Sequence, residues 1–347
     1  MSDALKFLGT GADDLDLALK FYSGKFIEAP RQSVFLYDTG LPVVERKTVT
    51  EGKSWQYLQN ADVPAPFDFD PGDEVQGQDG AVTEITVTVD NYIVVAKFIP
   101  EDQKHYAHFD YIGKLARQHK RKIEQLYDKR LFTVAALQAR EAAVTKNGLT
   151  VHNGGNRVTR DDESLVAAYP LSATGAARFR ADLRALAYQQ DLDNIDPEQR
   201  YLWIPPYMRQ VVLYDNTAQV FSEDYINGEN EQQTRKVMLL EGFRIIGFPN
   251  YSSAGGPLPD ENFVGNRQSK YDGNFTIGTA NGVPAALSLC ADNEGGAAVA
   301  LLTFEAITPF VIYEPKRFGW MVGARIFCGA SGLNPWCAGS VEVIDTD

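Results

Sequence analysis

The sequence predicts an elongated α+β protein, and three features of the chain lead to this fold class. Residues 101–146 contain no proline and a single glycine, so they favour one helix much longer than the usual length of about 8 to 20 residues. Residues 82–89 follow the period of two that marks an exposed strand. Further strand-like runs recur up to residue 344. At about 1.5 Å per residue the helix would reach roughly 65 to 70 Å, which exceeds what a compact globule of this size needs.

The N-terminal third is expected to form an arm and then a ribbon. Residues 1–45 read as an arm with a glycine-rich start and a thin core of its own. Two extended segments, residues 47–59 and 81–90, are predicted to pair as a long two-stranded ribbon. The tip between them is polar and is expected to project as a loop. It contains Pro64, Pro66, Asp68, Asp70, Pro71, Gly72, Asp73 and Glu74.

The long helix carries signals at both predicted ends. Pro100 suits the first turn, and the acidic residues that follow it suit the positive end of the helix dipole. Asn147 and Gly148 are expected to stop the helix. Apolar residues recur at helical spacing, too irregularly for a strict heptad coiled coil. Two shorter helices, bent near Gly113 or Asn147, are the alternative.

The remainder of the chain reads as a mixed α+β unit without internal repeats. Residues 151–160 are short and turn-rich. A second helix is expected over residues 175–190, capped by Thr174, with Phe179, Leu183 and Leu186 on one face. A short helix is expected to follow Pro205 and Pro206 and to run to Val212. Strands are expected at residues 201–204, 243–248, 297–304, 310–313, 319–328 and 340–344.

Composition excludes several classes of protein. With 347 residues and 44% hydrophobic content, the chain can bury a sizeable core in two or three domains. No apolar run approaches a membrane span, and residues 1–6 lack the features of a signal peptide, so we expect intracellular synthesis and no membrane partner. The net charge of −13 argues against nucleic-acid binding, and the basic run at residues 114–122 is expected to be a solvated or intersubunit face. Cys290, Cys328 and Cys337 are expected to be reduced, buried thiols.

Signatures of catalysis are missing from the sequence. No phosphate-binding loop or nucleophile elbow occurs, and the glycine turns at residues 153–156 and 254–257 do not join a clear strand to a clear helix. His105 and His108 could share a metal, but they lack a third ligand, so a solvent-facing pair is the favoured interpretation. The acidic tip lacks the glycine and glutamate of a calcium loop. We therefore predict no catalytic residue, no metal, no cofactor and no enzymatic activity.

The order of these elements resembles that of the major capsid proteins of tailed phages, particularly the short-tailed podovirus type. The resemblance spans almost the whole chain and rests on the order of five short segments. These are residues 52–57, 71–74, 84–87, 242–249 and 332–341. The resemblance implies the tailed-phage major capsid fold, of the Hong Kong ninety-seven type.

The same resemblance implies a division of the chain. Residues 1–45 correspond to the N-terminal arm, and residues 46–91 to the extended β-ribbon loop. The peripheral domain, with the long spine helix, corresponds to residues 92–148 together with 306–347. Residues 149–305 correspond to the axial domain.

The resemblance further implies a major capsid protein that self-assembles as pentamers and hexamers into an icosahedral shell around the double-stranded DNA genome. Its partners would be other copies of itself, a separate scaffolding protein during assembly, a portal protein at one vertex, a decoration protein where one exists, and packaged DNA bound without sequence specificity. It would be made in the host cytoplasm and reside in the virion. An encapsulin-type compartment shell is one alternative, and a soluble acidic metal-dependent enzyme is the other.

Contacts between subunits are predicted on the ribbon, its tip and the long helix. A two-stranded ribbon is marginal in water, so its aromatic residues are expected to be covered by a neighbour. The predicted contact residues are Lys53, Trp55, Tyr57, Asp70, Asp73, Glu74, Arg117 and Arg121. Some members of the family join a loop lysine to an asparagine of a neighbour, and Lys53 and Asn334 are the candidates for this crosslink. We expect no crosslink here, because the podovirus-type relatives do not obviously form one.

Overall fold

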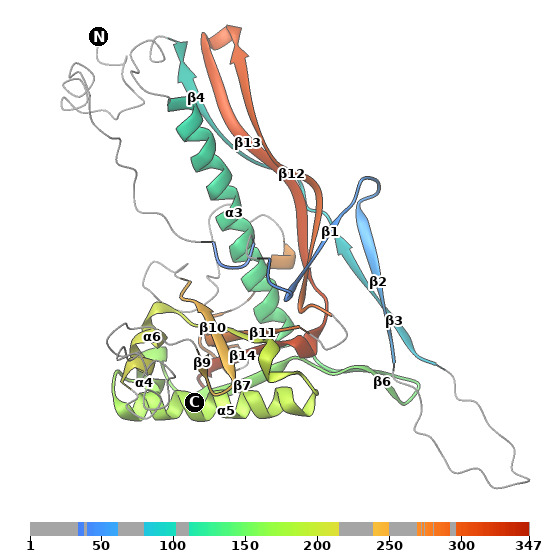
Figure 1. Cartoon of the computed structure of the whole chain (residues 1–347), viewed down its shortest axis with the longest axis vertical. Coiled ribbons are helices and arrows are strands. Elements are labelled where there is room, and N and C mark those ends of the chain that lie inside the picture. Colours follow the sequence, from blue (N-terminus) through green and yellow to red (C-terminus); the bar gives the residue numbers. More distant parts are fainter. Residues whose placement is uncertain are drawn as a thin grey trace, which may run out of the picture.

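The structure, a computed structural model, is an elongated molecule whose described residues form two large sheets and two two-stranded sheets (Figure 1). It describes residues 34–37, 40–61, 80–101, 111–214, 239–249, 269–271, 273, 275–279, 281–291 and 296–346. A four-stranded sheet runs beside one long helix, and a six-stranded sheet with shorter helices lies at the other end of the molecule. The mixed α+β class predicted from the sequence is confirmed.

The four-stranded sheet has the strand order β1-β12-β13-β4. Its strands are β1 (Val44–Thr48), β4 (Ile93–Pro100), β12 (Val299–Glu314) and β13 (Gly319–Gly332). β12 and β13 form a long antiparallel hairpin that turns at the 3-10 turn η4 (Pro315–Arg317), and β1 runs parallel to β12. The predicted strands at 297–304 and 310–313 are therefore one strand. Pro309 suggested a break, but β1 pairs β12 only as far as Thr303, so Pro309 lies where β12 is an edge strand and proline is tolerated.

The long helix α3 (Tyr111–Gln138) packs along one face of this sheet (Figure 1). Alternate residues of β13 point at it, and they share a buried core with one side of the helix. From β13 this core takes Val322, Ala324, Ile326, Cys328 and Ala330, and from α3 it takes Leu115, Ile123, Tyr127, Leu131 and Phe132.

The prediction that this helix runs to Lys146 was wrong. α3 ends at Gln138, and the chain then forms the hairpin of β5 (Val144–Lys146) and β6 (Leu149–His152). Asn147 and Gly148 both have positive φ, 53° and 77°, as the two central residues of a tight hairpin turn require. The same Asn-Gly pair that suggested a helix stop is therefore a hairpin turn, and a bend near Asn147 is excluded as well.

Glu101 is helical, as predicted, but Pro100 before it is not in a helical turn. It is the last residue of β4, where it pairs with Gly319 of β13. Residues 93–100 form a strand that the sequence analysis did not predict. Residues 102–110, which would begin the helix, lie outside the described residues.

The six-stranded sheet has the order β7-β14-β11-β8-β10-β9. Its strands are β7 (Asn156–Asp161), β8 (Arg200–Trp203), β9 (Leu239–Leu240), β10 (Phe243–Gly247), β11 (Val283–Cys290) and β14 (Ala338–Ile344). The predictions for β8, β10 and β14 are confirmed. β11 was missed because it is almost continuously apolar and buried, so it shows no alternation. β7 was taken for part of a turn-rich segment.

Helix α5 (Ala173–Leu192) covers this sheet with the apolar face that the sequence predicted. Phe179, Leu183 and Leu186 are fully buried against the sheet. The cap differs from the prediction, because the side chain of Ser172, not Thr174, accepts a hydrogen bond from the Gly175 amide. The short helix α6 (Pro206–Leu213) is confirmed, and α4 (Leu165–Ala168) precedes α5. Short 3-10 turns η1 (Pro197–Gln199), η3 (Ser269–Tyr271) and η5 (Pro335–Cys337) complete the described elements.

The predicted ribbon is present as β2 (Ser54–Asn60) and β3 (Val82–Thr88), which pair antiparallel over seven residues. It leaves the body beside the four-stranded sheet (Figure 1). The predicted first segment began too early, since Lys47 and Thr48 belong to β1 and pair with β12.

Candidate intersubunit surfaces

The inner face of the ribbon packs on its own chain. Tyr57 lies against the small buried cluster that Val49, Val87 and Leu302 help to form. Its hydroxyl donates to Glu45 Oε1 at 3.1 Å. Burial, with the nearby Glu45 carboxylate, raises the pKa of Tyr57 to about 12. Tyr57 is therefore partly covered by its own chain. The prediction that a neighbouring subunit must cover it treated the ribbon as an isolated hairpin.

Trp55 and Lys53, which precede Tyr57 along the chain, are both exposed. Trp55 retains 38% of its surface, and the Lys47 ammonium lies 4.5 Å from its ring centroid. On the outer face of the ribbon, Leu58 and Val82 are 74% and 50% exposed. Among the described residues of the ribbon, Leu58 is the most exposed large apolar side chain, and it was not among the predicted contact residues. An apolar residue at an outward position between polar ones, Gln56 and Asn60, was the available signal.

A buried ionic cluster fixes the root of the ribbon to the long helix. Asp90 lies two residues after the end of β3, and its side chain is 1% exposed. Arg130 of α3 and the Tyr271 hydroxyl donate to Asp90 Oδ2 at 3.0 and 2.6 Å. Lys270 Nζ lies 2.5 Å from Oδ1 as an ion pair, without the angles of a hydrogen bond. Because paired buried charges have few alternative geometries, the cluster sets how the ribbon leaves the body.

A second buried carboxylate holds the end of the arm. Asp128 of α3 accepts hydrogen bonds from the backbone N–H groups of Phe35, Leu36 and Tyr37 at 3.0, 2.6 and 2.8 Å. Arg46 donates to the carbonyls of Leu36 and Tyr37, which closes the loop from the other side. Burial raises the pKa of Asp128 to about 6, and the three N–H donors oppose that rise.

The outer face of the four-stranded sheet, the side away from α3, has an apolar middle. Two rows of residues cross β4, β13 and β12 there: Phe98, Met321 and Ile312, and Ala96, Gly323 and Phe310. Val94 pairs beside them with the exposed Arg325. Val94 and Ile312 are 54% and 53% exposed. A Cβ at Gly323 would lie 2.6 Å from the Phe310 ring, and one at Gly319 would lie 2.5 Å from the Phe98 ring. The glycines thus let both rings lie over the middle strand and flatten this face.

An exposed apolar face of this extent is a typical interaction surface. This face was not predicted from the sequence, because β4 was not predicted and β12 was predicted as two strands.

The predicted contact residues of the helix lie on its outward side. Arg117 is exposed and donates Nε to the Gly113 carbonyl at 3.4 Å. Arg121 is half-buried one turn further on. Lys120 pairs with Glu124 at 3.7 Å, which is the spacing of a weak surface ion pair. Asp70, Asp73 and Glu74 of the ribbon tip lie outside the described residues, as do His105 and His108.

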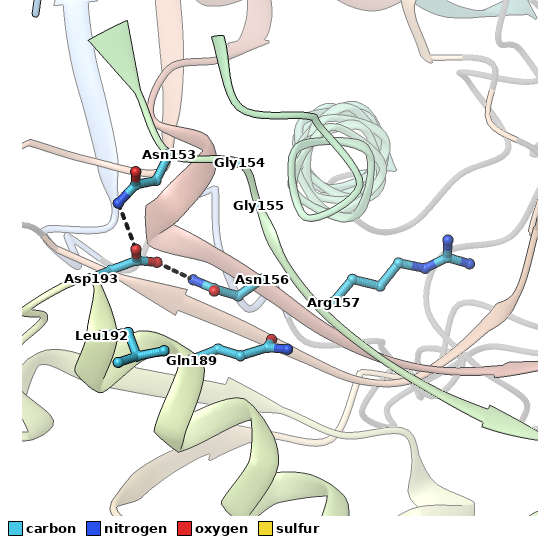
Figure 2. A pocket seen from close by; sticks show the side chains of 8 residues that line it. All are labelled: Asn153, Gly154, Gly155, Asn156, Arg157, Gln189, Leu192 and Asp193. Carbon is cyan, nitrogen blue, oxygen red and sulfur yellow. Dashed lines mark hydrogen bonds between the residues drawn. The ribbon is translucent and has the colours of Figure 1, made fainter. Parts of the chain in front are cut away.

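A pocket of about 340 Å³ opens beside the 153–156 turn (Figure 2). Asn153 and Asn156 each point an amide nitrogen at Asp193, at 2.7 and 2.9 Å, so both carboxylate oxygens are already engaged. Gly155 serves packing, since a Cβ there would lie 2.1 Å from the carbonyl oxygen of Gln138 at the end of α3. The backbone of the turn thus packs closely against the end of α3. The side chains of Asn153, Asn156 and Asp193 hydrogen-bond to one another.

Nothing in the described part of the chain assembles a metal or nucleophile site. No group of three or more potential ligands comes together among the described residues. The three cysteines are free and buried, as predicted, and burial raises the pKa of the Cys290 and Cys328 thiols to about 12. Thiols that hold their protons so firmly are poor nucleophiles. Among the described helices, none is long and apolar enough to cross a membrane.

Comparison with known proteins shows to which family this chain belongs. The sequence model of the family described as Gp10A-like, major capsid protein, matches residues 68–281, which is more than half of the chain. This chain belongs to the Gp10A-like major capsid protein family. It is thus a structural protein of a phage-type shell. No curated protein matches the chain.

Solved capsid structures share the fold of this Gp10A-like chain along nearly its whole length. A chain of the Cyanophage P-SCSP1u capsid is 19% identical, with 97% of this chain and 96% of that chain covered and a TM-score of 0.74. A chain of the mature capsid of bacteriophage PhiM1 is 13% identical, with 94% and 91% covered and a TM-score of 0.69. A chain of the empty GTA particle is 11% identical, with 96% and 98% covered and a TM-score of 0.59. The TM-scores show a common fold, and at identities this low the comparison supports no more than the fold.

Proposed function

We propose that this major capsid protein assembles as pentamers and hexamers into a closed icosahedral shell around double-stranded DNA, in a short-tailed phage. The observation that carries the proposal is the exposed apolar middle of the outer face of the four-stranded sheet. Val94 and Ile312 remain half-exposed there in a single copy, and a soluble monomer rarely leaves such a face uncovered. Neighbouring copies in a shell would cover it.

The same proposal assigns roles to the parts of the chain. The arm is residues 1–45, the ribbon is the extended loop at 46–91, and the peripheral domain is 92–148 with 306–347. Residues 149–305 would form the axial domain, around which the copies of one capsomer would meet. They contain five strands of the six-stranded sheet, and the sixth, β14, comes from the end of the chain. Exposed Lys53, Trp55 and Arg117, with half-buried Tyr57 and Arg121 and the acidic Asp70, Asp73 and Glu74, are proposed as contacts between copies.

Other partners follow from how such shells are built. A scaffolding protein would guide curvature during assembly in the host cytoplasm, a portal protein would replace one pentamer, and a decoration protein could bind outside. Packaged DNA would be held without sequence-specific contacts, because a shell subunit with a net charge of −13 repels phosphates on average. No observation favours the encapsulin-type compartment or the metal-dependent enzyme.

Electron microscopy tests the proposal directly. The chain would be expressed with and without its candidate scaffolding protein and viewed by negative stain. Closed shells or hexameric rings are expected when both proteins are present. Compact monomers under both conditions would refute the proposal, and shells that enclose a co-expressed cargo enzyme would assign the chain to a compartment instead.

A further inference from the structure

The hairpin of β5 and β6 packs on the far end of the ribbon. The last described rung of the ribbon is the hydrogen bond from the Ala61 N–H to the Ala81 carbonyl, at 2.8 Å. Both alanines are buried in one small apolar cluster with Val151 of β6, and Val144 and Leu149 of the same hairpin pack against it. The far end of the ribbon is therefore covered by another part of its own chain, where β6 lies beside the ribbon in Figure 1.

Lys146 adds a polar contact at the same place. It is the last residue of β5, and its Nζ donates to the carbonyl of Val82, the first residue of β3, at 3.0 Å. Val82 pairs with Asn60, one residue before the last described rung. Because a two-stranded ribbon is marginal in water, contacts of this kind decide whether its far end keeps one direction.

The base of the hairpin is bonded to the body of the subunit. The Gly155 N–H donates to the carbonyl of Glu141 at 2.8 Å, which joins the chain just after β6 to the chain just before β5. Asn153 and Asn156 donate to the two carboxylate oxygens of Asp193, the residue that follows α5 (Figure 2). The hairpin therefore starts from a point that is held by the segment after α3 and by the end of α5.

The ribbon is thus held at two separate places. Its root is fixed by the buried ion pair of Asp90 with Arg130, and its far end packs on the β5–β6 hairpin. One fixed point would leave the ribbon free to swing, whereas two fixed points define its direction. The direction is therefore set within a single subunit.

We propose that the β5–β6 hairpin fixes the direction of the ribbon and, through it, the curvature of the shell. The inference rests on the proposed shell function and assigns one element of the chain to the angle between neighbouring copies. When copies associate head to tail, the rotation from one copy to the next decides whether the assembly closes. A ribbon that swings would allow several rotations, so particles of several sizes would form.

Hydrogen exchange in the unassembled full chain tests whether the hairpin holds the ribbon. Leu149→Asp places a charge in the apolar contact, which is unfavourable. The Ala61 amide should then exchange about tenfold faster or more, because the last rung opens locally. The Val89 amide, which donates to the Lys53 carbonyl at the root, should keep its rate. Thr150→Asp is the matched control, since it introduces the same charge at the next residue, which is exposed, and should change neither rate.

A second variant tests the polar contact alone. Lys146→Met removes the hydrogen bond to the Val82 carbonyl at an exposed residue and leaves the apolar cluster intact. The Ala61 amide should exchange about threefold faster. Lys122→Met, at an exposed lysine of α3, makes the same chemical change away from the ribbon and should leave this rate unchanged.

Electron microscopy of shells assembled with the scaffolding protein tests the effect on curvature. Wild type and Thr150→Asp should give shells of one diameter, while Leu149→Asp should give open sheets or a spread of diameters at least about threefold wider. Shells of one diameter from Leu149→Asp would overturn the inference while the proposed function stands, and so would an unchanged exchange rate at Ala61. If wild-type protein forms no shells, the proposed function itself fails, and the assignment of curvature fails with it.

Discussion

Asp128 joins the end of the arm to the long helix through three backbone N–H groups. Replacing Asp128 by alanine removes the acceptors of Phe35, Leu36 and Tyr37 in one step. Because buried donors without partners each cost about 1 to 3 kcal/mol, we expect Asp128→Ala to lower the free energy of unfolding by about 3 to 5 kcal/mol. Asp128→Asn keeps one oxygen, the position that now serves Leu36 and Tyr37, and should cost only about 1 to 2 kcal/mol.

Urea unfolding of the unassembled subunit measures both values. Glu163→Ala, at an exposed acidic residue, is the control and should change the free energy of unfolding by less than about 0.5 kcal/mol. Equal losses for the alanine and asparagine variants would contradict the role given to the N–H donors.

The same carboxyl makes stability depend on pH. Its pKa is about 6 in the folded chain against an ordinary 3.8, so the folded state binds the proton more tightly than the unfolded state does. The stabilisation that protonation supplies is complete below about pH 4 and is lost as pH rises through 6. Asparagine cannot titrate. Wild type should therefore lose up to about 3 kcal/mol relative to Asp128→Asn between pH 4 and pH 7, measured by urea unfolding at each pH. A constant difference across this range would contradict the shifted pKa.

At the scale of elements, the Asp90 cluster connects the ribbon, the long helix and η3. Arg130 is 3% exposed in its side chain, so removing Asp90 leaves a buried guanidinium without its carboxylate. We expect Asp90→Ala to cost about 3 to 5 kcal/mol of unfolding free energy. Lys270 is 29% exposed and can turn to solvent, so Lys270→Met should cost about 1 kcal/mol or less. Urea unfolding separates the two, and a larger loss for Lys270→Met would mean that the lysine, not Arg130, holds the carboxylate.

The apolar outer sheet face makes a prediction of its own. Ile312→Glu places a charge where the proposal expects a neighbour, while the residue is already 53% exposed in the single subunit. The free energy of unfolding of the subunit should stay within about 0.5 kcal/mol of the wild type, yet shell yield should fall by about tenfold or more. Val166→Glu, at a 59% exposed valine of α4, is the matched control. Comparable shell yields for both variants would show that this face stays open in the particle.

Some elements of the fold could be predicted from the sequence, and others could not. Period-two alternation predicted β3, and helical spacing predicted the buried face of α5, because each element has one solvent-exposed face and one buried face. β11 is buried throughout and carries no such period, so it could not be found this way. Asn147 and Gly148 satisfy both a helix stop and a hairpin turn, and only the pairing of β5 with β6 decides between them. The apolar sheet face required the register of three strands, which no local pattern contains.

At the scale of the whole molecule, the long helix and the long hairpin form one stiff frame from which the ribbon and the arm depart. Both departures are fixed by buried carboxylates on or against the same helix, Asp128 for the arm and Asp90 for the ribbon. Lys53, Trp55, Arg117 and Ile312, which are proposed to meet neighbours, are by contrast exposed. In such a subunit, buried residues fix the positions of the arm and the ribbon, while different, exposed residues are proposed to contact the neighbouring copies.

The buried position of Asn334 predicts that the shell is not crosslinked through this residue. Asn334, the candidate acceptor, is 8% exposed; it donates to the Ala297 carbonyl at 3.0 Å and accepts from Gln59 of its own ribbon at 3.1 Å. An incoming lysine would have to displace Gln59 and break the donor bond before it could reach the amide carbon. We therefore expect no Lys53–Asn334 bond, and dissociated mature particles should give a single band near 38.4 kDa on a denaturing gel. A ladder of multiples that disappears in Lys53→Ala would show instead that assembly opens the site around Asn334.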